Sequence, residues 1–233
     1  MSRNLFIYAA ICVGFLANFP ASAEIVNATN PGSLPATAQD VTNTFATGID
    51  GNLLGATAVN VFEIDILDPL AFSATTVPLI SGVPDTKLFL FDGTGHAVYE
   101  NDDITGANTL SCLPSAIASN PCGFSGNGLG PFTAGNYFLA ITRSDEAPWD
   151  SLNNYLFNEA ADSTAVNGPD FSAGGANPIA GWDDGVYTAP NYDLTAYEID
   201  LTGTSPEPST GWLMAGAGAV LFGLRRRLSP RKA

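Results

Sequence analysis

Basic residues are scarce in this sequence of 233 residues, which holds 8 Lys and Arg against 23 Asp and Glu. Between Glu24 and Thr204 only Lys87 and Arg143 are basic and 22 residues are acidic, so this stretch carries a formal charge of −20. Such a surface repels the phosphate backbone of nucleic acids, which excludes nucleic-acid binding. It favours neutral or cationic partners, including divalent cations.

Histidine and cysteine are nearly absent, and this excludes several kinds of catalytic site. The single histidine, His96, would have to serve any Ser-His-Asp triad, yet the sequence has no Gly-x-Ser-x-Gly elbow for the nucleophile. A zinc site needs several His or Cys ligands, which this sequence lacks. The sequence also has no phosphate-binding loop, which excludes a nucleotide site of the common type. A pair of carboxylates for glycoside hydrolysis stays open, because that chemistry depends on their separation in space.

The first 23 residues have the pattern of a secretory signal peptide with an apolar helix. Arg3 provides the positive start, residues 5–19 are apolar, and Ala21 and Ala23 are the small residues that signal peptidase accepts. The apolar run is short for a membrane span. We therefore expect export, with Glu24 as the first residue of the mature chain.

The cysteine content agrees with export. Cys12 lies in the expected signal peptide, so the mature chain keeps only Cys112 and Cys122. Exported proteins meet an oxidising compartment, and the sequence has no C-x-x-C motif that would indicate a redox or metal site. We expect a disulfide bond between these two cysteines.

The C-terminal segment, residues 205–233, has three parts in a fixed order. Pro206-Glu207-Pro208 comes first, then an apolar stretch at residues 211–224, and then Arg225, Arg226 and Arg227. A helix of this stretch is just short of the hydrocarbon core of a bilayer, and the arginines would hold its end in the cytoplasm. The composition predicts an apolar helix that anchors the chain marginally, with the body outside.

These three parts resemble a PEP-CTERM sorting signal, the tag of exported bacterial proteins that exosortase processes. The resemblance implies that the inner membrane holds the tag transiently and that the chain is then cut near Pro206-Glu207-Pro208. The body would be released or transferred to the cell surface or extracellular matrix, often in organisms that make exopolysaccharide. The resemblance implies nothing about the activity of the body.

Between the two terminal segments, the sequence predicts strands and no long helix. Alternation of apolar and polar residues predicts strands at residues 61–66, 70–77, 86–91, 97–100, 137–142 and 197–202. In the third of these, both the Leu88/Leu90 pair and the Phe89/Phe91 pair are apolar, which is typical of a central strand covered on two sides. We expect residues 24–204 to form one all-β domain, an antiparallel β-sandwich or jelly roll with long Gly- and Asn-rich loops.

The order of these segments resembles bacterial pre-peptidase C-terminal (PPC-like) domains. The segments that carry the resemblance are residues 85–95, residues 100–103, residues 133–141 and the closing strand at Tyr197. The resemblance implies a small β-sandwich that commonly accompanies secreted enzymes as a non-catalytic module. The sequence departs from the pattern in two insertions, residues 104–131 and 144–190, and loops this long are usually functional or poorly ordered.

Acidic and amide residues gather at the ends of two predicted strands. Asp92 ends one strand, and Asn101, Asp102 and Asp103 end the next. Calcium prefers such oxygen ligands, so these four residues are a candidate calcium site. They belong at opposite ends of the second strand, so another loop, residues 145–146 or 183–185, would have to complete the site. The alternative is that these residues bond their own backbone in Asx turns.

The second insertion mixes aromatic residues with Asn and Asp. Flat aromatic faces beside polar acceptors suit a neutral carbohydrate. The candidate contact residues are Trp149, Tyr155, Trp182 and Tyr187. The alternative is that the aromatic side chains fix a loop without a core of its own to the sandwich, with Trp182 buried.

The sequence favours an exported, non-enzymatic surface or matrix protein with a structural or binding role. The alternative is a secreted hydrolase that acts on extracellular polysaccharide. The expected partners are signal peptidase, an exosortase-type processing enzyme, the inner membrane for a time and extracellular polysaccharide. Calcium is the one ligand expected beyond these.

Overall fold

A computed structural model describes residues 24–54, 59–78, 85–117, 121–158, 161–183 and 194–204. These residues all belong to one unit, Ala23–Pro206. The expected signal peptide, the C-terminal tag and Tyr187 lie outside the described residues, and so do the helices predicted for both termini. Within the described ranges, no helix is long and apolar enough to cross a membrane.

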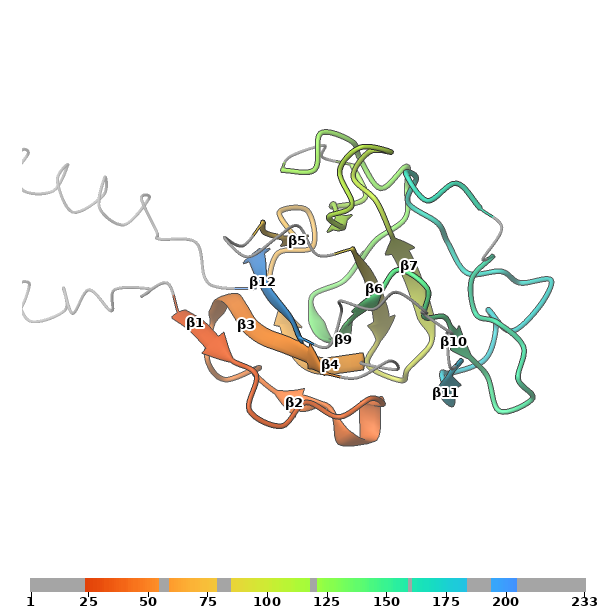
Figure 1. Ribbon diagram of the computed structural model, residues 1–233, viewed down its shortest axis with the longest axis horizontal. Coiled ribbons are helices and arrows are strands. Elements are labelled where there is room, and N and C mark those ends of the chain that lie inside the picture. The colour runs from red at the N-terminus through yellow and green to blue at the C-terminus, as the bar shows by residue number, and fades with distance from the viewer. Residues whose placement is uncertain are drawn as a thin grey trace, which may run out of the picture. The chain divides into compact units, whose positions relative to one another are not determined.

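Two five-stranded sheets form a β-sandwich (Figure 1). The strands of the first sheet, in spatial order, are β1 (Glu24–Asn27), β3 (Ala46–Leu54), β12 (Leu194–Thr202), β5 (Ser73–Thr76) and β8 (Cys112–Leu113). Those of the second are β2 (Gln39–Asp40), β4 (Val59–Ile66), β9 (Gly135–Arg143), β6 (Thr86–Asp92) and β7 (Ala97–Asn101). One short 3-10 helix, η1 (Pro35–Thr37), is the only helix that the described ranges contain, so the all-β prediction is confirmed.

The expectation of wholly antiparallel sheets is wrong at two edges. β1 pairs in parallel with β3, and β2 pairs in parallel with β4, so both sheets are mixed. The cause is the path of the chain, which changes sheet between β1 and β2, between β2 and β3, and again between β3 and β4. Each edge strand therefore reaches its neighbour through a crossover, which allows parallel pairing, and not through a hairpin.

The six strands that alternation predicted are present as β4, β5, β6, β7, β9 and β12. The longest pairing of the second sheet joins β4 and β9 from Val59 opposite Thr142 to Ile66 opposite Gly135. β6 lies between β9 and β7, which makes it a central strand as its residues indicated.

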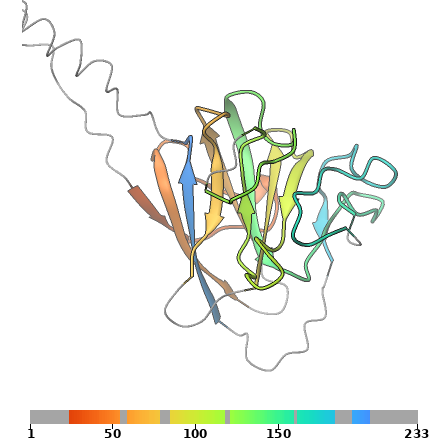
Figure 2. The same ribbon diagram turned by 90° about the horizontal axis from the view of Figure 1, so that it is seen from above.

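Both faces of the second sheet are covered. Its inner face packs on the first sheet, where residues such as Phe62, Leu88 and Leu90 meet Ile49 and Ile199. Its outer face carries a second apolar cluster that combines sheet residues with residues of the second insertion: Val59, Val61, Phe89, Phe91, Phe138, Ala140, Leu156, Phe157 and Ile179. Figure 2 shows the loops of this insertion on the side of the second sheet that faces away from the first.

The second insertion is held by short turns rather than by regular structure. Its described residues contain two two-residue strands, β10 (Pro148–Trp149) and β11 (Gly181–Trp182), which pair antiparallel. The buried carboxylate of Asp150 accepts hydrogen bonds from Leu152 N at 2.8 Å, Asn154 N at 2.9 Å and Asn177 Nδ2 at 2.7 Å. These bonds lower the pKa of Asp150 to about 2, with the bond from the Asn154 backbone as the largest cause.

The predicted disulfide bond is confirmed. Cys112 of β8 is joined to Cys122, and their Cα atoms lie 5.6 Å apart. The bond ties the first insertion to the edge of the first sheet.

Candidate functional site

The two ends of the β6–β7 hairpin hold acidic side chains in different surroundings. At the turn, Asp92 Oδ1 accepts hydrogen bonds from Thr94 N at 2.8 Å, Thr94 Oγ1 at 2.6 Å and His96 N at 3.0 Å. Burial by itself would raise the pKa of Asp92, but these hydrogen bonds lower it below its ordinary value. Asp92 thus makes an Asx turn, which is the alternative that the sequence left open for it.

Asn101, at the other end of the hairpin, is fully buried and joins three segments. Its side-chain amide donates to the carbonyl oxygens of Asp103 and Ala165, each at 3.1 Å, and its Oδ1 accepts from Cys112 N at 2.8 Å. These contacts connect β7 with β8 and with the second insertion. Asn101 therefore has a clear structural role.

Three carboxylates meet next to Asn101. Asp85, Asp102 and Asp103 are partly buried and offer oxygen atoms that all lie within 4.8 Å of one another. Of the four residues predicted as calcium ligands, the structure thus brings together Asp102 and Asp103, while Asp92 lies at the far end of the hairpin. Asp85 was missed, although it precedes β6 and an antiparallel hairpin brings that position close to the residues that follow β7.

Burial and the neighbouring charges raise the pKa of two of these carboxylates. Burial raises the pKa of Asp102 to about 8; Lys87 opposes this shift, and the charges of Asp103, Asp85 and Glu100 add to it. Burial also raises the pKa of Asp85. Asp102 Oδ1 is buried and has no hydrogen-bond partner among the described residues. The trio can share a proton or can supply three of the oxygen ligands that a calcium ion needs.

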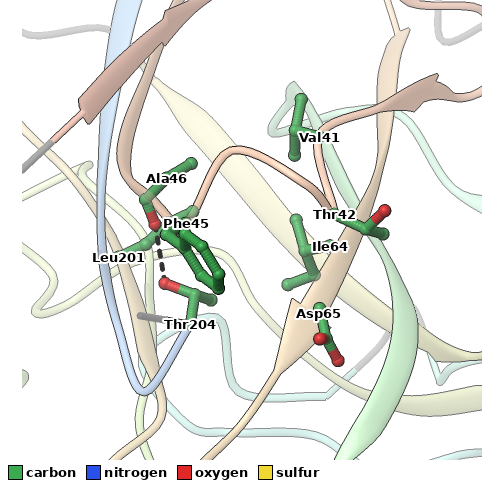
Figure 3. A pocket seen from close by; sticks show the side chains of 8 residues that line it. All are labelled: Val41, Thr42, Phe45, Ala46, Ile64, Asp65, Leu201 and Thr204. Carbon is green, nitrogen blue, oxygen red and sulfur yellow. Dashed lines mark hydrogen bonds between the residues drawn. The ribbon is translucent and has the colours of Figure 1, made fainter. Parts of the chain in front are cut away.

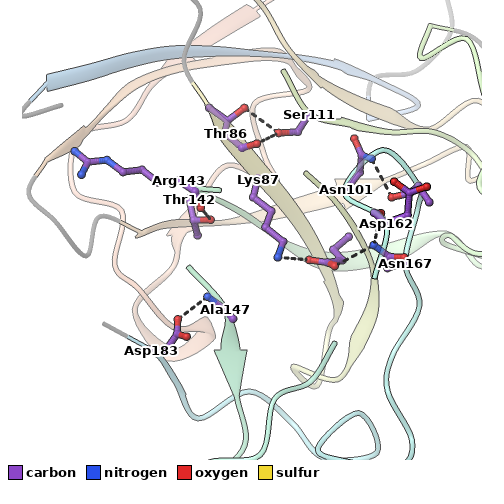
Figure 4. A network of polar contacts seen from close by, with 12 residues as sticks. Thr86, Lys87, Asn101, Ser111, Thr142, Arg143, Ala147, Asp162, Asn167 and Asp183 are labelled. Carbon is purple, nitrogen blue, oxygen red and sulfur yellow. Dashed lines mark hydrogen bonds and ion pairs between the residues drawn. The ribbon is translucent and has the colours of Figure 1, made fainter. Parts of the chain in front are cut away.

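A buried ion pair lies beside these carboxylates. Lys87 Nζ is 3.0 Å from Glu100 Oε2, and the side-chain amide of Asn167 donates to Glu100 Oε1 at 3.4 Å (Figure 4). A cavity of about 90 Å³ opens between Lys87, Glu100, Asn167, Asp102 and Ser144. Small-molecule sites usually exceed about 300 Å³, so this cavity suits water or an ion better than a sugar ring.

The aromatic residues of the second insertion divide into two groups. Trp182 is partly buried and packs edge-on against Phe89 and Phe91, with ring centroids 5.2 and 6.2 Å away. Its Nε1 donates to Ser33 O at 2.6 Å, so Trp182 fixes the insertion to the sandwich. Trp149 of β10 is also partly buried.

Tyr155, in contrast, keeps 42% of its surface exposed. Its hydroxyl donates to Asp183 Oδ2 at 3.1 Å, so an aromatic ring and a carboxylate lie side by side at the surface. Phe171, which is 75% exposed, is on the neighbouring segment, since Phe157 pairs with Pro169 and Asp170 N donates to Leu156 O. Sequence reasoning missed Phe171, because no pattern around it indicated which side it would face.

A second hollow at one end of the sandwich is too small for a ligand (Figure 3). It measures about 10 Å³, which leaves room for at most one water molecule. Phe45, whose φ of 50° is rare for a bulky residue, lines it. Thr204 also lines the hollow and donates to Ala46 O at 2.7 Å.

Comparison with known families gives one match. Residues 206–227 match the PEP-CTERM protein-sorting motif. The match runs from Pro206 to Arg227 and confirms the predicted tag. This motif indicates an exported protein that exosortase sorts, with a surface or extracellular destination. No curated protein matches the chain, and the resemblance of the body to PPC-like domains stays a prediction.

Proposed function

We propose that the chain is a non-enzymatic protein of the cell surface or extracellular matrix, in which the β-sandwich is a structural or binding module. The sorting motif carries this proposal, because it gives the destination of whatever precedes it. The last strand of the sandwich, β12, ends at Thr202, four positions before the motif begins at Pro206. Signal peptidase would cut after Ala23, and exosortase would cut near Pro208.

Several observations support a non-enzymatic body over a hydrolase. His96 lies in the β6–β7 turn, where its Nδ1 is 2.8 Å from Thr94 Oγ1. Asp85, Asp102 and Asp103 offer three oxygen atoms within 4.8 Å of one another, an arrangement that suits coordination of one cation. The described residues that line the cavity beside the trio include no aromatic residue, whereas a sugar-binding groove usually has one.

For the binding role, the exposed ring of Tyr155 supports a neutral or cationic polysaccharide. Phe171 offers a second exposed ring on the neighbouring segment, and Asp183 offers a carboxylate that can accept hydrogen bonds from sugar hydroxyls. The formal charge of −20 between Glu24 and Thr204 disfavours polyanionic polymers.

A calcium ion is the second ligand that we propose, now at Asp85, Asp102 and Asp103. The specific support is the close approach of three carboxylates together with the buried, unbonded Oδ1 of Asp102. Asp145 lies close enough to contribute to the raised pKa of Asp85, so the loop that was expected to complete the site is nearby. A bound ion would offset the repulsion within the trio.

The sorting proposal can be tested in a bacterial host that has an exosortase. The unaltered chain should reach the extracellular fraction without its tag. A variant with Pro206, Glu207 and Pro208 changed to Ala should stay in the membrane fraction, whereas the neighbouring change Ser209→Ala should be exported normally. Equal export of the tripeptide variant would contradict the proposal.

A further inference from the structure

Side chains from two other segments meet at the carboxylate of Glu100 under the second insertion. Glu100 of β7 contacts Lys87 Nζ of β6 through Oε2 at 3.0 Å and the amide of Asn167 through Oε1 at 3.4 Å. The backbones of Glu100 and Asn167 exchange two hydrogen bonds, at 2.9 and 3.0 Å, which hold Asn167 beside the strand. An amine and a carboxamide are thus brought to the two oxygens of one carboxylate (Figure 4).

The surroundings favour uncharged groups. Lys87 and Glu100 are 4% and 2% exposed, so water solvates neither charge well. Because burial penalises charge, moving a proton from the ammonium to the carboxylate costs little here compared with water. The product of that transfer is a neutral amine, which is a nucleophile.

We propose that Lys87 and Asn167 form an intramolecular isopeptide bond, with Glu100 as the group that transfers the protons.

The reaction balances without an oxidant or a cofactor. The lone pair of Lys87 Nζ attacks Asn167 Cγ, and the electrons of the carbonyl double bond move to Oδ1. Glu100 takes a proton from Nζ and delivers one to Nδ2, and the bond between Cγ and Nδ2 breaks as ammonia leaves. The carbonyl re-forms, so the product is a secondary amide between Nζ and Cγ. Glu100 touches both nitrogens, as a proton carrier must, and the adjoining cavity gives the ammonia a place to leave.

The bond would fasten β6 to the second insertion and close the loop from Lys87 to Asn167. The outer layer would then be held by a covalent link that reducing agents leave intact, unlike the bond between Cys112 and Cys122. Such a link suits a protein that works outside the cell, and it goes beyond the proposed function because it does not depend on any ligand.

Peptide mass spectrometry of the purified, reduced and denatured protein tests the bond. The body contains only two Lys and Arg residues, so cleavage at acidic or aromatic residues is the practical choice. We expect one linked pair of peptides, containing Lys87 and Asn167, whose mass is lower than their sum by one ammonia. Asn167 precedes Gly168, and succinimide formation at this pair would also release ammonia. The intact mass therefore cannot distinguish the two products, and only the linked pair of peptides identifies the isopeptide bond.

Four variants separate the roles of the three residues. Lys87→Arg keeps a cation beside Glu100 but removes the nucleophile, and Asn167→Ala removes the acceptor, so neither should contain the link. Asn167→Asp should still form it, now with loss of water. Glu100→Gln should slow its formation at least tenfold in freshly folded protein.

The cavity offers a matched control and two competing acceptors. Asn158→Ala changes another asparagine of the cavity lining and should leave the link in place. A link from Lys87 to Asp102 or to Asn158 would overturn the assignment of Asn167. Folded wild-type protein in which Lys87 and Asn167 are recovered only in separate peptides would overturn the proposal altogether.

Discussion

The two faces of the second sheet are both apolar, yet they are built in different ways. The inner face meets another sheet of regular strands, and its cluster consists of apolar side chains such as Phe62, Leu88 and Leu139. The outer face meets an irregular insertion, and beside its apolar cluster lie the Lys87–Glu100 pair and Asp102. The comparison teaches that stability and chemistry are divided between the two faces, with the reactive and charged groups on the outer one.

Polar side chains substitute for regular structure in the outer layer. Asp150 joins its own turn to the segment of Asn177, and Trp182 bonds Ser33 as well as packing on the sheet. Hydrogen bonds of this kind contribute about 1 kcal/mol each, less than the burial of a large apolar side chain. The outer layer should therefore open more readily than the sandwich itself.

The largest effect is expected on the inner face. Phe62 is fully buried between the two sheets, and Phe62→Ala should lower the free energy of unfolding by about 4 kcal/mol through lost burial and the cavity that remains. Urea unfolding should show one transition at a lower midpoint. A loss below about 1 kcal/mol would mean that the inner face does not hold the fold together.

The matching change on the outer face is Phe157→Ala. Phe157 is 1% exposed and belongs to the cluster of Phe89 and Phe91. The substitution should lower the free energy of local unfolding of the insertion by about 3 kcal/mol, and it should affect the sandwich less. Hydrogen exchange should speed up in residues 147–183 and change little in β3 and β12. Equal acceleration in both regions would erase the distinction between the layers.

Calcium should act on the outer face alone. With free calcium a hundredfold above its dissociation constant, binding at Asp85, Asp102 and Asp103 should add about 2.7 kcal/mol to stability. The melting temperature should therefore rise with millimolar calcium at constant ionic strength. Asp103→Asn should abolish this rise, and Asp92→Asn, at the other end of the hairpin, should keep it. An equal response to matched sodium chloride would show that charge screening is the whole effect.

The smallest effect concerns pH and Asp102. Its pKa is raised to about 8 in the folded protein, so folding is penalised once the unfolded chain ionises near pH 4, and the penalty grows until about pH 8. In chelator, Asp102→Asn should match the wild type at pH 3 and exceed its stability by about 2 kcal/mol at pH 9, because partial exposure offsets much of the burial cost. Urea unfolding at both values tests this. A constant difference across that range would contradict the assigned shift.

Alternation of apolar and polar residues was enough to predict six strands, β4, β5, β6, β7, β9 and β12. β3 was not predicted because glycines interrupt the alternation of apolar and polar residues. Gly51 is needed there, because a side chain at this position would collide with the side chain of Tyr197. The edge strands β1 and β2 were also missed, and β2 has only two residues, too few to show a period.

The candidate site was predictable only in part. Asp102 and Asp103 stood out because they follow a strand, but Asp85 joins them only through the pairing of β6 with β7. The contact between Lys87, Glu100 and Asn167 depends on how the second insertion lies on the sheet, and no local pattern encodes that. Residues far apart in sequence meet here because the insertion needs an apolar surface to cover.

Mass spectrometry of the native mature protein tests the central claim, which is export followed by removal of the tag, because it reports both ends of the chain. The account predicts Glu24 as the first residue and a last residue near Pro208, at the start of the matched motif at residues 206–227. Recovery of peptides from residues 213–224 in the extracellular protein would contradict it.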